Sequence, residues 1–528
     1  MRTSRVLFLA LALAALPGRA AAPGDGERWW SHVRYLASDA LQGRDTGSPG
    51  YREAAAYVEK TLRAAGVRPA GTAGYEQPIR FRSRRVVEER SHVALRRGGE
   101  EEPLAFGDDV VAGARAEGGP VDAPVVFVGW GVSAPEEGHD DLAGLDLRGK
   151  IAMFISGSPP ELSPEVSAHA GSSGERWKAL RAAGAVGEIS VANPKKMESP
   201  WARRALSRKK PAMELADPAL DDLVGERISL SVNPASADKF FEGSPHPFAE
   251  IVELATAKKT LPRFALPVTL HADVAIESTD VESFNVVGVL PGSDPRLAKE
   301  YVALSAHLDH VGVGAPIAGD SIYNGAMDNA SGCAALLDFA QELHERGERP
   351  RRSILWVFVT GEEKGLLGSR WFGRHPTVPI HAIVADLNID MFLPLFPLKL
   401  VTVLGLEEST LGDVIRRVAA EQGIAVQRDP EPDRHVFVRS DQYNFVREGV
   451  PAIMVDVAAP PGTPEAATLK RWLAERYHAP SDDDRQPIDL ASAASYERLL
   501  FGVARAVADG DARPEWKPDS YFRRFASR

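Results

Sequence analysis

In the second half of the chain, short apolar runs alternate with longer amphipathic segments. The run SILWVFVT (353–360) is almost continuously apolar, which is typical of a strand that helices cover on both faces. Alternating strands and helices predict an α/β fold, a three-layer sandwich with a mostly parallel, mixed central sheet. We predict further strands at 285–290, 301–306, 382–390 and 400–404, and helices at 330–346, 365–372, 411–422 and 492–508.

The first half of the chain shows a different pattern. Residues 29–65 predict helices, interrupted by a turn at GSPG (47–50), and strands follow near 75–81 and 92–95. From about 116 to 265 the pattern predicts a compact module of its own, α/β or β-rich. Within this module we expect strands at 124–131, 150–155 and 186–191, a helix at 176–183 and an exposed basic loop at 193–210.

Length and composition fit a globular protein of two domains. The 528 residues are 44% hydrophobic and 26% charged, which allows a large core. The formal net charge of -11 argues against nucleic acid as a partner, because nucleic-acid binding depends on a basic surface.

The N-terminus has the pattern of a secretory signal peptide. Arg2 and Arg5 precede an apolar run at 6–16, and small residues follow at 20–22. This run is too short to span a bilayer, and no later segment is long and apolar enough to do so. We therefore predict a signal peptide at 1–22, export to the periplasm or the medium, and no membrane anchor.

The chain contains a single cysteine, Cys333. One cysteine excludes an intrachain disulfide and a cysteine-built metal site. An exported protein without disulfides suits a bacterial periplasm or medium, since a large core needs no cross-links. Cys333 itself is expected to be a small buried packing residue.

Side chains that bind metals or transfer protons follow several predicted strands. HLDH (307–310), GEE (361–363) and NIDM (388–391) each end a strand, whereas NGAMDN (324–329) and YHAPSD (477–482) precede helices. In open α/β sheets, ligands bind outside the carboxyl ends of the strands, so these segments can converge.

Each segment alone has an ordinary explanation. Asp328 and Asn329 could cap a helix, His307 is one of 13 histidines, and Glu362 with Glu363 could form a solvated turn. Their joint placement at one sheet edge favours a functional site, because buried carboxylates without partners are costly.

Two imidazoles with several carboxylates suit zinc, and a carboxylate shared by two ions would create a co-catalytic pair. Such a pair also needs a carboxylate that takes the proton of the attacking water. Glu362 and Glu363 are adjacent, so one can bind metal while the other faces the water. Asp309 is placed to accept the outer imidazole proton of His307. His307 and His310 are too close in sequence for the helical HExxH motif.

These segments resemble the co-catalytic zinc peptidase family that includes bacterial leucyl aminopeptidases and glutamate carboxypeptidase. The matching stretches occur in the family's order and span most of the chain. They are LQGRDTGSPGYREAAAYV (41–58), SAHLDHVG (305–312), NGAMDNASG (324–332), TGEEKGLLGS (360–369), NIDMF (388–392), RSDQYNF (439–445) and YHAPSDD (477–483).

The resemblance implies two Zn²⁺ ions per chain, a zinc-peptidase fold and a role for each site residue. His307 and Asp390 would bind one zinc, Glu363 and His478 the other, and Asp328 would bridge them. A second set of residues would carry the chemistry: Glu362 as general base on a metal-bridging water, Asp309 to orient His307, and Tyr477 near the developing oxyanion.

Residues 116–265 resemble a protease-associated domain. The resemblance rests on VVFVGWGV (125–132), the strand start at 149–151 and the helix that follows. In this family such inserts often lie over the active-site cleft. The catalytic domain would then comprise 23–115 and 266–528. One departure is Gln442, where many relatives carry histidine; it concerns pocket polarity rather than a metal ligand.

The resemblance implies an enzyme that hydrolyses N-terminal residues from peptide substrates, an aminopeptidase. A carboxypeptidase or dipeptidase of the same fold is the first alternative. Such an enzyme would need cationic side chains that bind a substrate carboxylate, and Arg439 is one candidate. A non-catalytic receptor on a peptidase scaffold is the second, but receptors of this kind are expected to lose metal ligands, and all five ligands and the base are present.

Overall fold

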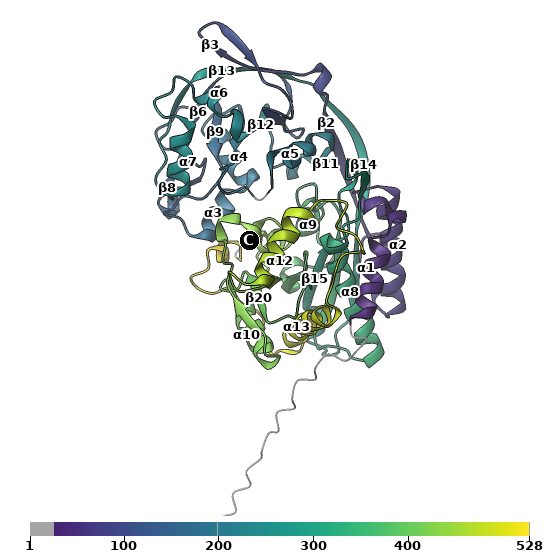
Figure 1. Cartoon of the computed structure of the whole chain (residues 1–528). Coiled ribbons are helices and arrows are strands. Elements are labelled where there is room, and N and C mark those ends of the chain that lie inside the picture. The colour runs from purple at the N-terminus through teal and green to yellow at the C-terminus, as the bar shows by residue number, and fades with distance from the viewer. Residues whose placement is uncertain (1–25, 198, 527–528) are drawn as a thin grey trace, which may run out of the picture.

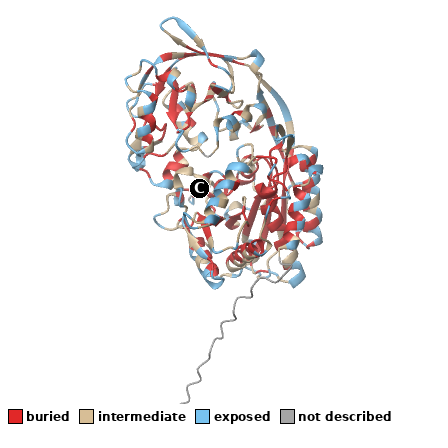
Figure 2. Ribbon diagram, viewed as in Figure 1, coloured by how far each residue is buried: buried red, intermediate tan, exposed pale blue. Residues whose placement is uncertain are grey.

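The protein is described by a computed structural model that covers residues 26–197 and 199–526 (Figure 1). The predicted signal peptide at 1–22 lies outside these residues. The chain folds into two bodies, each with its own sheet and core (Figures 1 and 2). Within the described part of the chain, no helix combines the length and apolarity needed to cross a bilayer.

A ten-stranded mixed sheet forms the centre of the larger body. Its order is β11-β2-β14-β18-β15-β19-β22-β20-β21, and β1 pairs with β14. The neighbours β18, β15, β19 and β22 run parallel, whereas β14 and β20 run antiparallel to this centre. The bounds are β1 Arg68–Pro69, β2 Glu76–Val86, β11 Ala212–Leu215, β14 Ile276–Leu290, β15 Tyr301–His307, β18 Ser353–Val359, β19 Ile383–Asn388, β20 Leu400–Leu404, β21 Ala425–Gln427 and β22 Ala452–Ala458.

Helices cover both faces of this sheet, which confirms the predicted three-layer sandwich. Every residue of β18 is buried. Its residues alternate between two cores: Trp356 packs with one helical layer, and Val357 packs with the other. The first layer contains α1 (Glu27–Leu36), α2 (Pro49–Ala64), α8 (Ser331–Arg346), α10 (Leu411–Glu421) and α13 (Leu490–Asp509), and the second contains α9 (Leu367–Arg374) and α11 (Gln442–Arg447).

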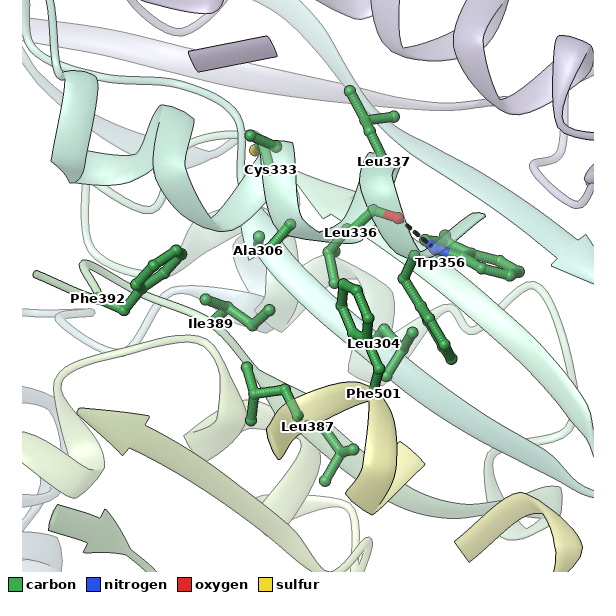
Figure 3. Close-up of a cluster of buried hydrophobic side chains, with 14 of the residues drawn as sticks. Leu304, Ala306, Cys333, Leu336, Leu337, Trp356, Leu387, Ile389, Phe392 and Phe501 are labelled. Carbon is green, nitrogen blue, oxygen red and sulfur yellow. Dashed lines mark hydrogen bonds between the residues drawn. The ribbon is translucent and has the colours of Figure 1, made fainter. Parts of the chain in front are cut away.

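The core between the sheet and α8 is apolar and closely packed (Figure 3). Trp356 on β18 donates its indole N–H to the carbonyl oxygen of Leu336 on α8, at 3.0 Å. This bond satisfies the one polar atom of a fully buried ring. Cys333 is buried at the start of α8 and lies in the same core, as expected for a packing residue.

The second body contains an eight-stranded sheet in the order β4-β3-β13-β6-β9-β10-β12-β5. Its helices also lie on both faces: α6 (Asp238–Phe241) and α7 (Phe248–Thr256) share one core, and α4 (Ser173–Ala182) has another. The strands are β3 His92–Arg97, β4 Glu100–Pro103, β5 Val110–Ala112, β6 Gly119–Phe127, β9 Ile151–Ile155, β10 Gly187–Val191, β12 Ile228–Val232 and β13 Phe264–Val274.

This second sheet extends beyond the predicted module at both ends, because β3 pairs with β13 and β5 pairs with β12. Long antiparallel strands, β2 and β14, connect the two bodies (Figure 1). The segment at 193–210 is not the exposed loop that its composition predicted. It contains α5 (Trp201–Arg204) and a 3-10 helix, η4 (Ala205–Lys209), and it leads into β11 at the edge of the main sheet.

Candidate metal centre and active site

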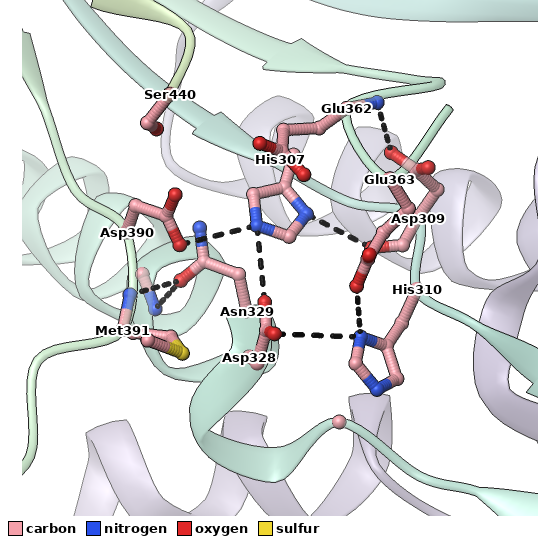
Figure 4. Close-up of polar contacts among 12 residues, drawn as sticks. His307, Asp309, His310, Asp328, Asn329, Glu362, Glu363, Asp390, Met391 and Ser440 are labelled. Carbon is pink, nitrogen blue, oxygen red and sulfur yellow. Dashed lines mark hydrogen bonds and ion pairs between the residues drawn. The ribbon is translucent and has the colours of Figure 1, made fainter. Parts of the chain in front are cut away.

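The predicted site residues meet at the carboxyl edge of the parallel strands (Figure 4). His307 is the last residue of β15, Glu362 and Glu363 follow β18, and Asp390 follows β19. Asp328 lies in the turn before α8. His478 comes from the loop after α12 (Pro464–Glu475) and joins them through its contacts with Asp328 and Glu363.

One group of three side chains forms around His307. Its Nε2 atom lies 3.2 Å from Oδ1 of Asp390 and 3.3 Å from Oδ1 of Asp328. Two carboxylate oxygens therefore converge on one ring nitrogen, as the ligands of a shared cation do. Ligands of a tetrahedral zinc ion at 2.0–2.1 Å lie about 3.3 Å from each other. This group fits a zinc ion.

A second group of three forms around His478. Its Nε2 atom lies 3.2 Å from Oδ2 of Asp328 and 3.2 Å from Oε2 of Glu363. Asp328 therefore offers one oxygen to each histidine, which is the arrangement of a carboxylate that bridges two ions. Burial opposes protonation of His478, but Glu363 and Asp328 outweigh it and raise the pKa of His478 to about 10. The site thus has an excess of negative charge that favours cations.

The backbone around Asp328 is held by several buried groups. The carboxylate of Asp482 accepts hydrogen bonds from the backbone N–H of Met327, at 2.9 and 3.2 Å, and of Asp328, at 3.1 Å. Gly325 has a φ of 62°, and a Cβ atom there would lie 2.2 Å from the carbonyl oxygen of Asp328. Only glycine fits this position.

Arg44, from the N-terminal LQGRDTG stretch, fastens the same region. Its guanidinium donates to the carbonyl oxygens of Leu308 at 3.0 Å, Asn324 at 2.7 Å and Gly325 at 3.0 Å. Arg44 and Asp482 lie in motifs that the sequence singled out, but they were not predicted as positioning residues.

Asp309 contacts His307 differently from the prediction. The Nδ1 atom of His307 lies 3.0 Å from the backbone carbonyl oxygen of Asp309, not from its carboxylate. Since a carbonyl can only accept, Nδ1 carries the proton and Nε2 is left as the ligand atom. The carboxylate instead accepts from the hydroxyl of Thr46 at 2.9 Å and from the backbone N–H of Glu362 at 3.2 Å.

Glu362 and Glu363 lie in different environments although they are neighbours. Glu363 pairs with His310 at 2.7 Å and with His478. Glu362 forms no ion pair with any of these histidines. Burial raises the pKa of the Glu362 carboxyl well above its usual value, although His307 opposes this shift.

His310 is a site residue that sequence reasoning missed. Its ring is fully buried, with Nδ1 2.7 Å from Oε1 of Glu363 and 4.0 Å from Oδ2 of Asp328. His310, Asp328 and Glu363 could themselves hold an ion. We favour His478 as the ligand, because it is equidistant from both carboxylates at 3.2 Å, whereas His310 lies at hydrogen-bond distance from Glu363 alone.

Tyr477 stacks on the ring of His478, with centroids 3.9 Å apart and an interplanar angle of 27°. Burial raises the pKa of Tyr477 well above its usual value, so its hydroxyl stays protonated. Gln442 does not line the metal centre. It is fully buried and accepts a hydrogen bond from the side chain of Asn388 at 2.8 Å.

An α/β sandwich with histidines and carboxylates gathered around one shared aspartate at its carboxyl edge is the architecture of a metal-dependent hydrolase. Residues 285–504, which carry every predicted metal ligand, match the profile described as Peptidase family M28. This part of the chain, which is less than half of the 528 residues, is similar to peptidase family M28.

The fold has solved counterparts. The structure is similar to that of an aminopeptidase from Aneurinibacillus sp. strain AM-1, with a TM-score of 0.55 and 18% identity over 94% of this chain and 97% of that one. At this identity the similarity supports the fold alone.

Curated relatives match over shorter stretches. Leupeptin-inactivating enzyme 1 of Streptomyces exfoliatus is 27% identical over 175 residues, 33% of this chain and 36% of the relative. Carboxypeptidase Q of Xenopus laevis is 30% identical over 123 residues, 23% and 24% of the two chains. The chain thus spans about a third or less of the length of these relatives.

Proposed function

We propose that this protein is an exported dinuclear zinc exopeptidase that hydrolyses N-terminal residues from peptides. The observation that carries the proposal is the position of Asp328, whose two oxygens each face a different histidine. The match of residues 285–504 to peptidase family M28 supports the reaction class. The predicted signal peptide at 1–22 supports export.

His307 and Asp390 would hold one zinc ion, Glu363 and His478 the other, and Asp328 would bridge them. Two zinc ions held there would supply Lewis acidity to the scissile carbonyl and to the attacking water. Glu362 is the candidate general base, because it is buried beside the ligands but pairs with none of the histidines. It would take the proton from the water and pass it to the leaving amine. Asp309 holds the backbone N–H of Glu362 and so positions this base.

Tyr477 has a weaker case. Stacking on His478 supports a role in orienting the ligand ring, and its protonated hydroxyl could donate to a developing oxyanion.

We infer that the second body, predicted at 116–265, is an inserted protease-associated domain that limits access to the centre. It is hydrogen bonded to α11 and to the segment that precedes α11. His169 is hydrogen bonded to Tyr443 at 2.6 Å, and Ser158 to His435 at 2.7 Å. Such contacts favour a second body that is held in place against the larger body rather than one that moves freely.

A carboxypeptidase or dipeptidase of the same fold is the second candidate. The matches to carboxypeptidase Q favour it, but they cover about a quarter of each chain. A receptor is disfavoured, because the full set of predicted ligands and the base converge in one place.

The experiment uses purified mature protein and short peptides with free or acetylated N-termini, analysed by mass spectrometry with and without a chelator. We expect stepwise loss of N-terminal residues from the free peptides only, abolished by the chelator. Loss of C-terminal residues, or equal cleavage of acetylated peptides, would contradict the aminopeptidase proposal.

A further inference from the structure

Lys210 lies in the segment that leads from the second body into β11, and it has no ion pair of its own among the described residues. Its ammonium lies 4.1 Å from the ring centroid of Tyr323, and its Cε atom is so near Gly314 that a Cβ atom there would lie 3.1 Å away. Among the ion pairs of the described residues, Lys209 pairs with Glu88, whereas Lys210 has no carboxylate within 4.0 Å.

Lys210 contacts a segment that leads directly to a predicted metal ligand. Tyr323 ends β17 (Asp320–Tyr323), which leads into the turn that carries Asp328. Lys364 directly follows Glu363 and pairs with Asp45 at 2.8 Å, so it is already occupied. Burial lowers the pKa of Lys210 to about 8, and Glu363 opposes this shift. The ammonium is therefore mostly charged at neutral pH and lies within the electrostatic influence of a predicted metal ligand.

The segment that carries Lys210 also contacts α12, the helix that precedes the loop of His478. Arg203, on α5, donates to the carbonyl oxygen of Ala474 at 2.7 Å, near the end of α12 and shortly before Tyr477 and His478. The other end of the segment contacts the hairpin of β16 (Gly312–Ile317) and β17 through Lys210. Residues 201–210 therefore connect the loop of His478 to the hairpin that precedes Asp328.

We propose that Lys210 binds a carboxylate of the substrate, and that this carboxylate is the free C-terminus of a short peptide. The proposal rests on the proposed exopeptidase function. A half-buried ammonium without a carboxylate partner is suited to an anion, and a charge-assisted bond to a carboxylate is strong. An extended chain advances about 3.3–3.6 Å per residue, so only dipeptides and tripeptides place their C-terminus close to the metal centre.

The experiment compares kcat/KM for a dipeptide with that for its C-terminal amide. We expect the wild-type enzyme to favour the free acid by about tenfold or more, as one charge-assisted contact allows. Lys210→Met should reduce this ratio to near 1, mainly through KM. Lys209→Met is the matched control, because Lys209 is exposed and paired with Glu88, and it should keep the wild-type ratio.

A second pair of substrates identifies the source of the carboxylate. Amidated peptides with Glu or Gln in the second position carry an acidic side chain but no free C-terminus. Loss of the acid-to-amide preference in Lys210→Met supports the C-terminal carboxylate; loss of a Glu-to-Gln preference instead would contradict that source and assign Lys210 to acidic side chains.

Two results would overturn different parts of the account. If the wild-type enzyme cleaves the peptides and both ratios are unchanged in Lys210→Met, the Lys210 proposal is wrong and the exopeptidase proposal stands. If the wild-type enzyme cleaves none of these peptides, the proposed function itself is wrong.

Discussion

The two halves of the candidate metal centre are held in different ways. His307 and Asp390 lie at the ends of neighbouring parallel strands, β15 and β19, and the His307 side chain is 1% exposed. His478 lies in a loop after α12, and its side chain is 37% exposed. The central sheet positions both ligands of the first half. In the second half Glu363 also follows a sheet strand, β18, but His478 depends on a loop and on its stacking with Tyr477.

Asp328 joins two ion sites whose histidine ligands differ in exposure and in the backbone that carries them. Asp328 is 4% exposed and takes part in both halves, so the sheet-borne half positions it for the loop-borne half. A side chain that is exposed and lies on a loop can move away from a bound ion with little loss of packing, so its release costs less free energy. We therefore expect the zinc ion at His478 and Glu363 to exchange faster than the zinc ion at His307 and Asp390.

Glu362→Gln should have the largest effect on turnover while leaving both halves loaded. The amide cannot take the proton from water, and general-base catalysis typically contributes about 10²- to 10⁴-fold. We expect kcat to fall by this amount with unchanged zinc content, measured by peptide hydrolysis and elemental analysis. Wild-type turnover in this variant would show that another group is the base.

His478→Ala and His307→Ala each remove the histidine ligand from one half of the centre, so comparing them tests the two halves separately. The first variant should lose one zinc ion and keep the other, because Asp328 and the His307 half remain in place. His307→Ala should lose zinc from the sheet-borne half and disturb the bridge as well. Zinc content after dialysis against a weak chelator measures the difference. Equal loss in both variants would contradict the unequal halves.

His310→Leu should have the smallest effect and should weaken only the loop-borne half. Leucine fills the buried space but removes the contact with Glu363, and loss of such a partner typically costs about 10- to 100-fold in metal affinity. Competition with a fluorescent chelator measures this affinity. Thr46→Val is the matched control, because Thr46 contacts the carboxylate of Asp309 rather than a predicted metal ligand and should leave this affinity unchanged.

The three-layer fold could be predicted because its signals are local. The run at 353–360 is apolar on both faces, and the metal-binding residues stand at strand ends where a parallel sheet brings them together. β22 was missed in the sequence, although Ala452–Ala458 pairs with both β19 and β20. Its short run of apolar residues carries Asp456 and gives a weaker signal than β18.

Features that depend on distant partners could not be predicted. The residues at 193–210 have the composition of an exposed loop, but Arg208 pairs with Glu88 and Arg203 bonds to Ala474. Similarly, the sequence cannot tell whether Asp309 meets His307 through its carboxylate or its carbonyl. The structure decides this, because Thr46 and Glu362 occupy the carboxylate.

The central claim is that one aspartate joins two zinc ions in a single chain. The most direct test is the zinc content of the purified, metal-saturated protein, measured by elemental analysis against an accurate protein concentration. The account predicts two zinc ions per chain. A value of one at saturation would contradict the bridge at Asp328 and the two-ion mechanism with it.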